Sequence, residues 1–311
     1  MHKKAPILSR RALMKAICAT AAALHIAPHE LFAVGRNKIT RAIPATGETL
    51  AVMGLGTSRT FDIDIDELGQ SQLYEVMQAF FDNGGQLIDS SPMYGNAETI
   101  IGELLGTAKN SGGLFSATKV WSYGMAASIE QMQRSMDRMG VQVMDLMQIH
   151  NLRDWQVHIK TLRDWKEQGK IRYTGITTSH GRYHGELEKI LKTVPLDFVQ
   201  LSYNIDNRVA EERLLPIAED KGIATLINRP FQRGSLFRIV KGKPLPDWTA
   251  EFDCASWGQY FLKFVASHPT VTCIIPATTK IKHLLDNMAA GFGRLPDAKM
   301  RQRMIRHLES L

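Results

Sequence analysis

The segment QLIDSSPMYG, residues 86–95, joins a short apolar run to a polar turn, and its pattern recurs through the chain. The apolar run ends at Asp89, and Tyr94 follows five residues later. Helical periodicity begins at residue 97, so this stretch predicts one strand–loop–helix unit. A carboxylate and a phenol after a strand also suit an ordinary turn, so the rest of the chain must decide between a turn and a site.

Eight apolar runs predict strands, and each is followed by a stretch with helical periodicity. The strand predictions are 50–57, 85–90, 114–121, 143–150, 171–178, 196–203, 223–230 and 271–277. The helix predictions are 70–82, 97–108, 127–139, 157–168, 182–192, 208–220, 256–267 and 280–290. Short strands that alternate with helices indicate parallel pairing through right-handed crossovers. Eight such units favour an α/β fold of the closed (β/α)₈ TIM barrel type.

Other features of the chain agree with a barrel rather than an open doubly wound sheet. An open dinucleotide-binding sheet usually carries GxGxxG after its first strand, whereas MGLGT (53–57) supplies only GxG, with Arg59 where the third glycine would stand. We expect an N-terminal β-hairpin over 40–50, around Thr46-Gly47, and a C-terminal helix near 297–310. Both elements lie outside the repeat.

Charge and hydropathy limit the classes of partner. The chain has 311 residues, 44% of them hydrophobic, and a formal net charge of +7. Residues 1–33 contain five basic residues and one acidic residue, so +4 of that charge belongs to them and +3 remains. That remainder is too small to indicate nucleic-acid binding. No apolar run approaches about eighteen residues, so we expect no stable membrane anchor.

Residues 1–33 are similar to a bacterial twin-arginine signal peptide. Paired Arg10 and Arg11 follow Ser9, an apolar stretch covers 16–27, and small Ala33 is available for cleavage. A basic amphipathic first helix is the alternative. The signal interpretation predicts a periplasmic or exported protein, with the twin-arginine translocase as a partner during export. It divides the chain into a signal peptide, 1–33, and a barrel domain, 34–311.

Four titratable residues stand at or just beyond the C-terminal ends of three consecutive predicted strands, where such barrels place their chemistry. They are Asp89, Tyr94, Lys119 and His150. A lysine that ends an apolar strand needs a compensating charge, and Asp89 is the natural partner. A nearby ammonium lowers the pKa of a phenol, which makes Tyr94 a proton donor, while His150 hydrogen-bonds a substrate oxygen. Taken singly, each residue also fits a structural role.

This constellation resembles the aldo-keto reductase family, from about residue 38 to residue 310. The matching segments are MGLGT (53–57), IDSSPMYGNAETIIGELL (88–105), ATKV (117–120), DLMQIHN (145–151), GKIRYTGIT (169–177), VQLSYN (199–204), RPFQRGSL (229–236) and IIPATTKIKHLLDN (274–287). The resemblance implies an oxidoreductase that reduces aldehydes or ketones to alcohols by hydride transfer from NAD(P)H. Tyr94 is then the general acid, Asp89 and Lys119 tune its acidity, and His150 orients the carbonyl.

The resemblance also implies a nicotinamide cofactor, NADP in the first place and NAD as the alternative. Gln200 then bonds the carboxamide, Tyr203 stacks on the nicotinamide, and Lys280 meets the 2′-phosphate. Thr177-Thr178 and His283 depart from the usual family residues. The full set of implied cofactor-binding residues is Gly56, Thr57, Asp89, Thr177, Thr178, Gln200, Tyr203, Pro230, Phe231, Gln232, Gly234, Leu236, Thr278, Lys280, Asp286 and Asn287.

Met93, Trp121 and Trp155 follow the catalytic strand ends and predict apolar walls for a small-molecule carbonyl substrate, although helix packing explains them equally well. We expect no metal site. Two other functions remain open. One is an exported nicotinamide-binding regulatory or scaffold protein with weak turnover. The other is a barrel with different chemistry, such as a sugar hydrolase, which needs paired carboxylates at strand ends where only Asp89 stands.

Overall fold

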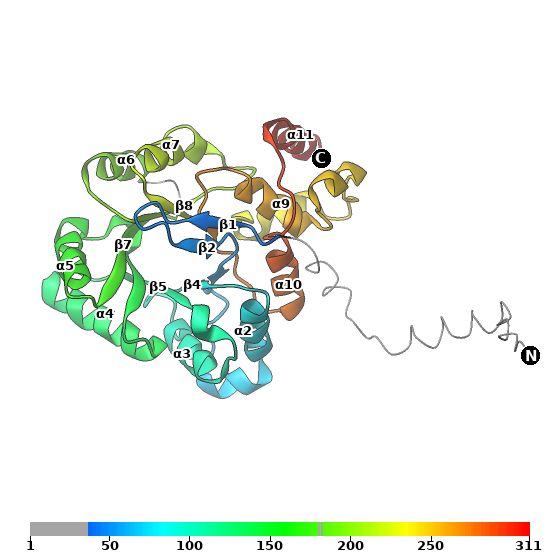
Figure 1. Ribbon diagram of the computed structural model, residues 1–311. Coiled ribbons are helices and arrows are strands. Elements are labelled where there is room, and N and C mark those ends of the chain that lie inside the picture. The colour runs from blue at the N-terminus through cyan, green and yellow to red at the C-terminus, as the bar shows by residue number, and fades with distance from the viewer. Residues whose placement is uncertain (1–36, 180, 182) are drawn as a thin grey trace, which may run out of the picture. The chain divides into compact units, whose positions relative to one another are not determined.

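A parallel barrel forms the centre of the protein (Figure 1). The computed structural model describes residues 37–179, 181 and 183–311, so the predicted signal peptide lies outside the described residues. The sheet order is β10-β9-β8-β7-β6-β5-β4-β3, and bridges Met53–Ile274 and Gly56–Ala277 join its two edges. The predicted (β/α)₈ TIM barrel is confirmed. The strands are β3 (Leu55–Gly56), β4 (Leu87–Asp89), β5 (Phe115–Val120), β6 (Met144–Ile149), β7 (Ile171–Thr177), β8 (Phe198–Ser202), β9 (Ala224–Asn228) and β10 (Cys273–Ile274).

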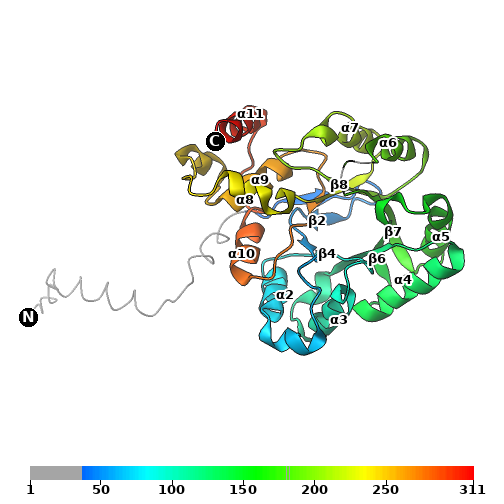
Figure 2. The ribbon, with the colours of Figure 1, turned by 180° about the vertical axis from the view of Figure 1, so that it is seen from behind.

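Amphipathic helices surround the strands, as the views from the front and from behind show (Figures 1 and 2). In α2, the buried residues recur with helical spacing at Leu73, Val76, Met77, Phe80 and Phe81, so one face packs on the sheet. Among the described residues, no helix has the length and apolar character needed to cross a membrane. The α-helices are α2 (Leu73–Asp82), α3 (Ala97–Thr107), α4 (Met125–Met139), α5 (Trp155–Glu167), α6 (His184–Thr193), α7 (Leu214–Asp220), α8 (Ser235–Ile239), α9 (Trp257–Ala266), α10 (Ile281–Ala289) and α11 (Ala298–Glu309).

Short 3₁₀ helices shape several of the connecting loops. The predicted helix over 208–220 begins as η5 and continues as α7. The segment between β9 and α9 folds into three short helices that the apolar pattern did not predict. The 3₁₀ helices are η2 (Ile65–Gln70), η3 (Ser111–Gly113), η4 (His150–Leu152), η5 (Val209–Glu211), η6 (Gln232–Gly234) and η7 (Asp247–Phe252).

An antiparallel hairpin, β1 (Thr40–Ala42) and β2 (Thr49–Ala51), precedes the barrel and confirms the predicted hairpin. Its tip contains Gly47, whose φ of 77° suits glycine. Ile43 and Leu50 join the buried interior cluster that includes Phe115 and Phe198, so the hairpin seals the end of the barrel opposite the site. The predicted strand over 50–57 is therefore divided, because its first two residues pair in the hairpin.

Alternation along each strand separates the barrel interior from the helix-facing layer. In β8, Phe198 belongs to the interior cluster, whereas Val199 and Leu201 pack with the helices. The predicted C-terminal helix is confirmed as α11, whose first turn is capped by Asp297 accepting a hydrogen bond from the Met300 N–H at 2.7 Å. The Tyr260 hydroxyl of α9 donates to the Met304 carbonyl at 2.8 Å and ties α11 to the barrel.

Candidate active site

A cavity of about 880 Å³ opens among the loops that follow the C-terminal ends of the strands. Its walls come from almost every strand–helix connection, which the closed barrel brings together. Most of the residues predicted for chemistry or cofactor binding line it. They are Gly56, Thr57, Asp89, Met93, Tyr94, His150, Thr177, Gln200, Pro230, Phe231, Gly234, Thr278, Asp286 and Asn287.

Lys119 and Asp89 form a buried ion pair beneath this cavity. Lys119 is fully buried, and its Nζ donates to Asp89 Oδ2 at 2.6 Å and to the Ser90 carbonyl at 2.6 Å. Burial alone would lower the pKa of Lys119, but attraction by Asp89 and Tyr94 outweighs burial, and the pKa is raised above its ordinary value. Lys119 is therefore an ammonium at neutral pH. The ion pair predicted from the strand ends is present.

The second oxygen of Asp89 is held by two amides from other strands. Gln148 Nε2 donates to Asp89 Oδ1 at 2.8 Å, and Gln200 Nε2 donates to the same atom at 2.9 Å. Asn228 Nδ2 donates to Gln200 Oε1 at 3.2 Å and extends the chain of amides to β9. Sequence reasoning missed Gln148. A polar residue two positions before His150 in an otherwise apolar strand was the available signal, because alternation places both on the inner face.

Tyr94 stands over the Lys119–Asp89 pair at the mouth of β4. Lys119 Nζ lies 5.1 Å from the centroid of the Tyr94 ring. Burial raises the pKa of Tyr94 above its ordinary value of 10.0, and Lys119 and a hydrogen bond with Ser58 only partly oppose that rise. The expected net lowering of this pKa is therefore wrong. The ammonium is present, but the apolar surroundings have the larger effect, and the phenol stays protonated at neutral pH.

His150 completes the group as a neutral imidazole. Burial, together with repulsion from Lys119 and Arg153, lowers the pKa of His150 to about 3. Its ring lies edge-on to the Tyr94 ring, with centroids 5.9 Å apart. Ser91 Oγ lies 3.0 Å from His150 Nδ1 and accepts a hydrogen bond from the Met93 N–H; a Ser91 hydroxyl that donates to Nδ1 keeps that nitrogen unprotonated. In that arrangement Nε2 carries the ring proton and is a hydrogen-bond donor.

Comparison with known proteins shows which family the chain belongs to. Residues 52–304, more than half of the chain, match the model of the Aldo/keto reductase family. The chain belongs to the aldo/keto reductase family. The resemblance inferred from the sequence is thus confirmed, as is the predicted enzyme class, an oxidoreductase of this family.

Individual relatives of this aldo/keto reductase are distant. Aldo-keto reductase YhdN of Bacillus subtilis is 26% identical over 68% of this chain and 66% of YhdN, just under two thirds of its length. The NADH-specific methylglyoxal reductase of Escherichia coli is 27% identical over 65% of this chain and 70% of that protein. A Klebsiella pneumoniae aldo/keto reductase crystallised with NADP and acetate superposes with a TM-score of 0.71, at 21% identity over 88% of this chain and 95% of that one. This last likeness supports the fold.

Tyr203, predicted to stack on the nicotinamide, does not line the cavity of this aldo/keto reductase. Gln200 and Ser202 point into the barrel, so alternation turns Tyr203 toward the helices. Its ring packs near Phe264, with centroids 6.2 Å apart, and its hydroxyl bonds Arg301 at 2.7 Å. The prediction is corrected: Tyr203 anchors α9 and α11. Asn228, on the next strand, lines the cavity.

Several other predicted residues stand beside the cavity without lining it. Trp121 is covered by Arg153, whose guanidinium carbon lies 3.9 Å from the ring centroid, and Trp155 donates to Glu186 at 3.2 Å, so neither forms the expected substrate wall. Leu236 is a fully buried core residue, and Gln232 Oε1 accepts from Asn204 at 3.1 Å. Lys280 is the N-cap residue just before α10, and its side chain is exposed.

The cavity has features that fit a dinucleotide. A Cβ added to Gly56 would approach the Ile275 carbonyl oxygen to 2.6 Å, so the chain needs glycine at this part of the wall. Thr178 Oγ1, next to the lining residue Thr177, is buried without a hydrogen-bond partner. Gly234 adopts φ of 86° with open space around it, which permits close approach of a phosphate to the backbone. These residues fit the cofactor that the family resemblance implies.

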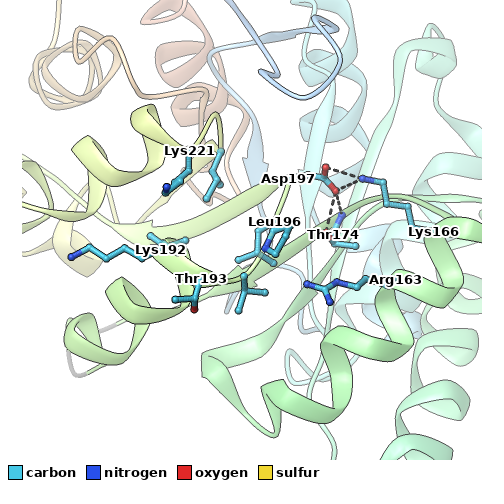
Figure 3. A pocket seen from close by; sticks show the side chains of 12 residues that line it. Arg163, Lys166, Thr174, Lys192, Thr193, Leu196, Asp197 and Lys221 are labelled. Carbon is cyan, nitrogen blue, oxygen red and sulfur yellow. Dashed lines mark hydrogen bonds and ion pairs between the residues drawn. The ribbon is translucent and has the colours of Figure 1, made fainter.

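A second cavity, of about 440 Å³, lies toward the N-terminal ends of β8 and β9 (Figure 3). It is rich in cations, but each lysine has a structural partner. Lys166 binds both oxygens of Asp197, at 2.6 and 2.8 Å, Lys192 pairs with Glu188 at 2.7 Å, and Lys221 pairs with Asp220 at 3.6 Å. This end of the barrel serves stability rather than catalysis.

Proposed function

We propose that this aldo/keto reductase reduces aldehydes or ketones to alcohols, with Tyr94 as the proton donor. A reduced nicotinamide dinucleotide, when bound, supplies the hydride, that is, both electrons, to the carbonyl carbon. Tyr94 gives its hydroxyl proton to the carbonyl oxygen and regains a proton from solvent. The observation that carries the proposal is the 2.6 Å pair of Lys119 and Asp89 directly beneath the Tyr94 ring.

Proton transfer from Tyr94 is favoured by the charge of Lys119. The phenol is protonated before the reaction, since its ordinary pKa of 10.0 lies above neutral pH and burial raises it further. As the proton leaves, negative charge develops on the Tyr94 oxygen, and the Lys119 ammonium stabilises that charge in a site of low dielectric. Asp89 keeps Lys119 charged, and Gln148 and Gln200 fix the orientation of Asp89. The pair thus acts on the developing phenolate more than on the resting phenol.

His150 orients the substrate carbonyl. With a pKa of about 3 it stays neutral, and the hydrogen bond between Nδ1 and Ser91 favours a proton on Nε2. A neutral donor binds a carbonyl oxygen without adding a second positive charge beside Lys119. Tyr94 and His150 then bond the same oxygen, which aligns the carbonyl group for attack on its carbon.

The cofactor that we propose is NADPH, with NADH as the alternative. The lining residues that would contact the cofactor include Thr177, Thr278 and Asn287, together with Pro230, Phe231, Arg233 and Gly234 of the loop after β9. The relatives support both forms, since the Klebsiella protein was crystallised with NADP and the Escherichia coli reductase is named NADH-specific. Lys280 remains the candidate for the 2′-phosphate, and the closer position of His283 to the cavity makes it the alternative.

Titration of the purified protein with each reduced cofactor, followed by turnover on a panel of small aldehydes and ketones, tests this function. We expect binding of at least one cofactor and its oxidation in step with alcohol formation. Tight cofactor binding with no turnover on the panel would favour a regulatory or scaffold protein. The absence of binding to both cofactors would reject the proposal altogether.

We further propose that the protein is exported through the twin-arginine translocase to the periplasm or beyond. The support is the sequence of residues 1–33, with paired Arg10 and Arg11 before an apolar stretch. The barrel domain is then 34–311, and the described residues form one compact unit from Asn37 to Leu311. This route carries folded proteins, which suits a barrel that encloses its cofactor.

A further inference from the structure

A tight turn after β3 presents Arg59 at the cavity. The N–H groups of Thr60 and Phe61 both donate to the Thr57 carbonyl at 3.2 Å, which closes the turn around Ser58 and Arg59. Arg59 has φ of 66°, in the left-handed region where glycine is the usual residue. The arginine therefore occupies a backbone conformation that costs energy for a residue with a Cβ, and glycine would adopt it without that cost.

The turn is fixed against the loop that carries Tyr94. Thr57 Oγ1 donates to the Asp89 carbonyl at 3.0 Å, and Asp62 Oδ1 accepts from the Asn96 N–H at 3.0 Å. Ser58, the immediate neighbour of Arg59, is close enough to Tyr94 to oppose in part the rise of its pKa on burial. Since adjacent Cα atoms are about 3.8 Å apart, the guanidinium is within reach of a small substrate whose carbonyl contacts Tyr94.

Arg59 provides an uncompensated positive charge at this position. It is exposed, lines the cavity, and has no ion-pair or hydrogen-bond partner for its side chain among the described residues. Three acids line this cavity: Asp89 is paired with Lys119, Asp286 accepts hydrogen bonds from Ser256 and Gln259, and Asp62 accepts one from the Asn96 backbone N–H. Thr60 Oγ1, next in the turn and also at the cavity, is buried without a hydrogen-bond partner. A cation and a hydroxyl without partners are the groups that bind a carboxylate.

We propose that Arg59 and Thr60 form an anion subsite, so that the preferred substrate is a carbonyl compound bearing a carboxylate, such as an oxo acid or a formyl acid. This inference rests on the proposed reductase function and specifies its substrate class. The guanidinium forms two parallel hydrogen bonds to the carboxylate, and the carbonyl end of the same molecule lies at Tyr94 and His150.

A second arginine in the same cavity supplies the matched control. Arg233 is also exposed, also has a positive φ, of 56°, and also lacks a side-chain partner among the described residues. It lies in η6 beside Gly234, in the loop proposed to hold the cofactor phosphates. Loss of Arg233 should therefore weaken cofactor binding and lower kcat/KM equally for charged and neutral substrates. Loss of Arg59 should lower kcat/KM for the charged substrate only.

The test compares 4-carboxybenzaldehyde with its neutral analogue methyl 4-formylbenzoate, as a ratio of kcat/KM values, in wild type, Arg59→Gly, Arg59→Lys and Arg233→Ala. Glycine suits the backbone at position 59, so Arg59→Gly should fold at least as well as wild type. We expect that ratio to fall about ten- to a hundredfold in Arg59→Gly, the range for a charge-assisted contact, through KM for the acid. In Arg59→Lys the ratio should fall less than in Arg59→Gly, because the positive charge is kept. In Arg233→Ala the ratio should be unchanged.

An unchanged ratio in Arg59→Gly would overturn the subsite, as would a rise in the cofactor Kd large enough to explain the loss. Benzoate carries a carboxylate but no aldehyde or ketone, so its binding to the enzyme–cofactor complex, measured by tryptophan fluorescence, tests the anion subsite independently of reductase activity. If wild type reduces neither aldehyde and no other member of the aldehyde and ketone panel, the reductase proposal fails. Benzoate binding that weakens in Arg59→Gly then still supports the anion subsite, and equal binding by both proteins refutes it.

Discussion

Lys119 Nζ lies 2.6 Å from Asp89 Oδ2, at a place where the two side chains are 0% and 3% exposed. Lys119→Met removes the charge that compensates Asp89 and leaves a buried carboxylate unpaired. We expect a loss of about 3–5 kcal/mol in the free energy of unfolding, measured by urea denaturation. The double variant Asp89→Leu, Lys119→Met should recover most of that stability and remain inactive. Equal destabilisation of both variants would show that packing, rather than charge pairing, sets the cost.

The depressed pKa of His150 predicts a dependence of stability on pH. The unfolded chain takes up a proton near the ordinary pKa of 6.5, whereas the folded protein does not until about pH 3. Falling pH therefore favours the unfolded state through this window, and the contribution is constant above about pH 7. Between pH 6.5 and pH 5 the wild type should lose about 1.5 kcal/mol relative to His150→Gln. A pH dependence identical in the two proteins would show that His150 titrates normally.

Gln148 is a positioning residue in this account, because it touches Asp89 rather than substrate. Gln148→Leu removes one of two amide donors from Asp89 Oδ1 and should cost about 1–3 kcal/mol of stability. We also expect a lower kcat with an unchanged cofactor Kd, since Asp89 would hold Lys119 less firmly. The exposed Gln133→Leu on α4 is the control. A variant with full kcat would mean that Gln200 alone suffices to orient Asp89.

Export can be tested without any assay of activity. Arg10→Lys together with Arg11→Lys preserves the charge of the first segment but removes the paired guanidinium groups that the translocase recognises. The full-length protein should then accumulate in the cytoplasm, folded and unprocessed. Fractionation followed by mass spectrometry of the N-terminus measures this, with a Lys3→Arg, Lys4→Arg variant as the control. Normal recovery of shortened protein outside the cytoplasmic membrane would exclude a twin-arginine route.

The sequence predicted the barrel well because its signals are local and repeated. Each strand–helix unit carries its own apolar periodicity, and parallel pairing follows from the alternation alone. The strand boundaries were less certain. Leu50 and Ala51 have the apolar pattern of a strand, which fits both the first barrel strand and the preceding hairpin, and only their pairing with Arg41 and Thr40 assigns them to the hairpin. Nothing in the apolar pattern distinguished these two possibilities.

Site residues were predicted correctly where their type and their position at a strand end were enough to place them. They were predicted wrongly where the direction of the side chain determines whether it faces the cavity. Asp89, Tyr94, Lys119 and His150 converge because each follows or ends a strand. The prediction for Tyr203 was wrong because this residue lies one position out of phase with the inward-facing residues of β8. The pKa of Tyr94 was misjudged because the depth of burial, which opposes Lys119, depends on loops distant in sequence.

The central claim is that Tyr94 donates the proton in carbonyl reduction, and single-turnover mixing of the enzyme–cofactor complex with 4-carboxybenzaldehyde tests it most directly. Tyr94→Phe removes one hydroxyl and keeps the ring against His150. The account predicts that wild type oxidises its bound cofactor in one phase, while Tyr94→Phe binds the cofactor with similar Kd and slows that phase by a factor of about 10²–10⁴, the range for general acid catalysis. A Tyr94→Phe variant that retained most of the wild-type rate would contradict it.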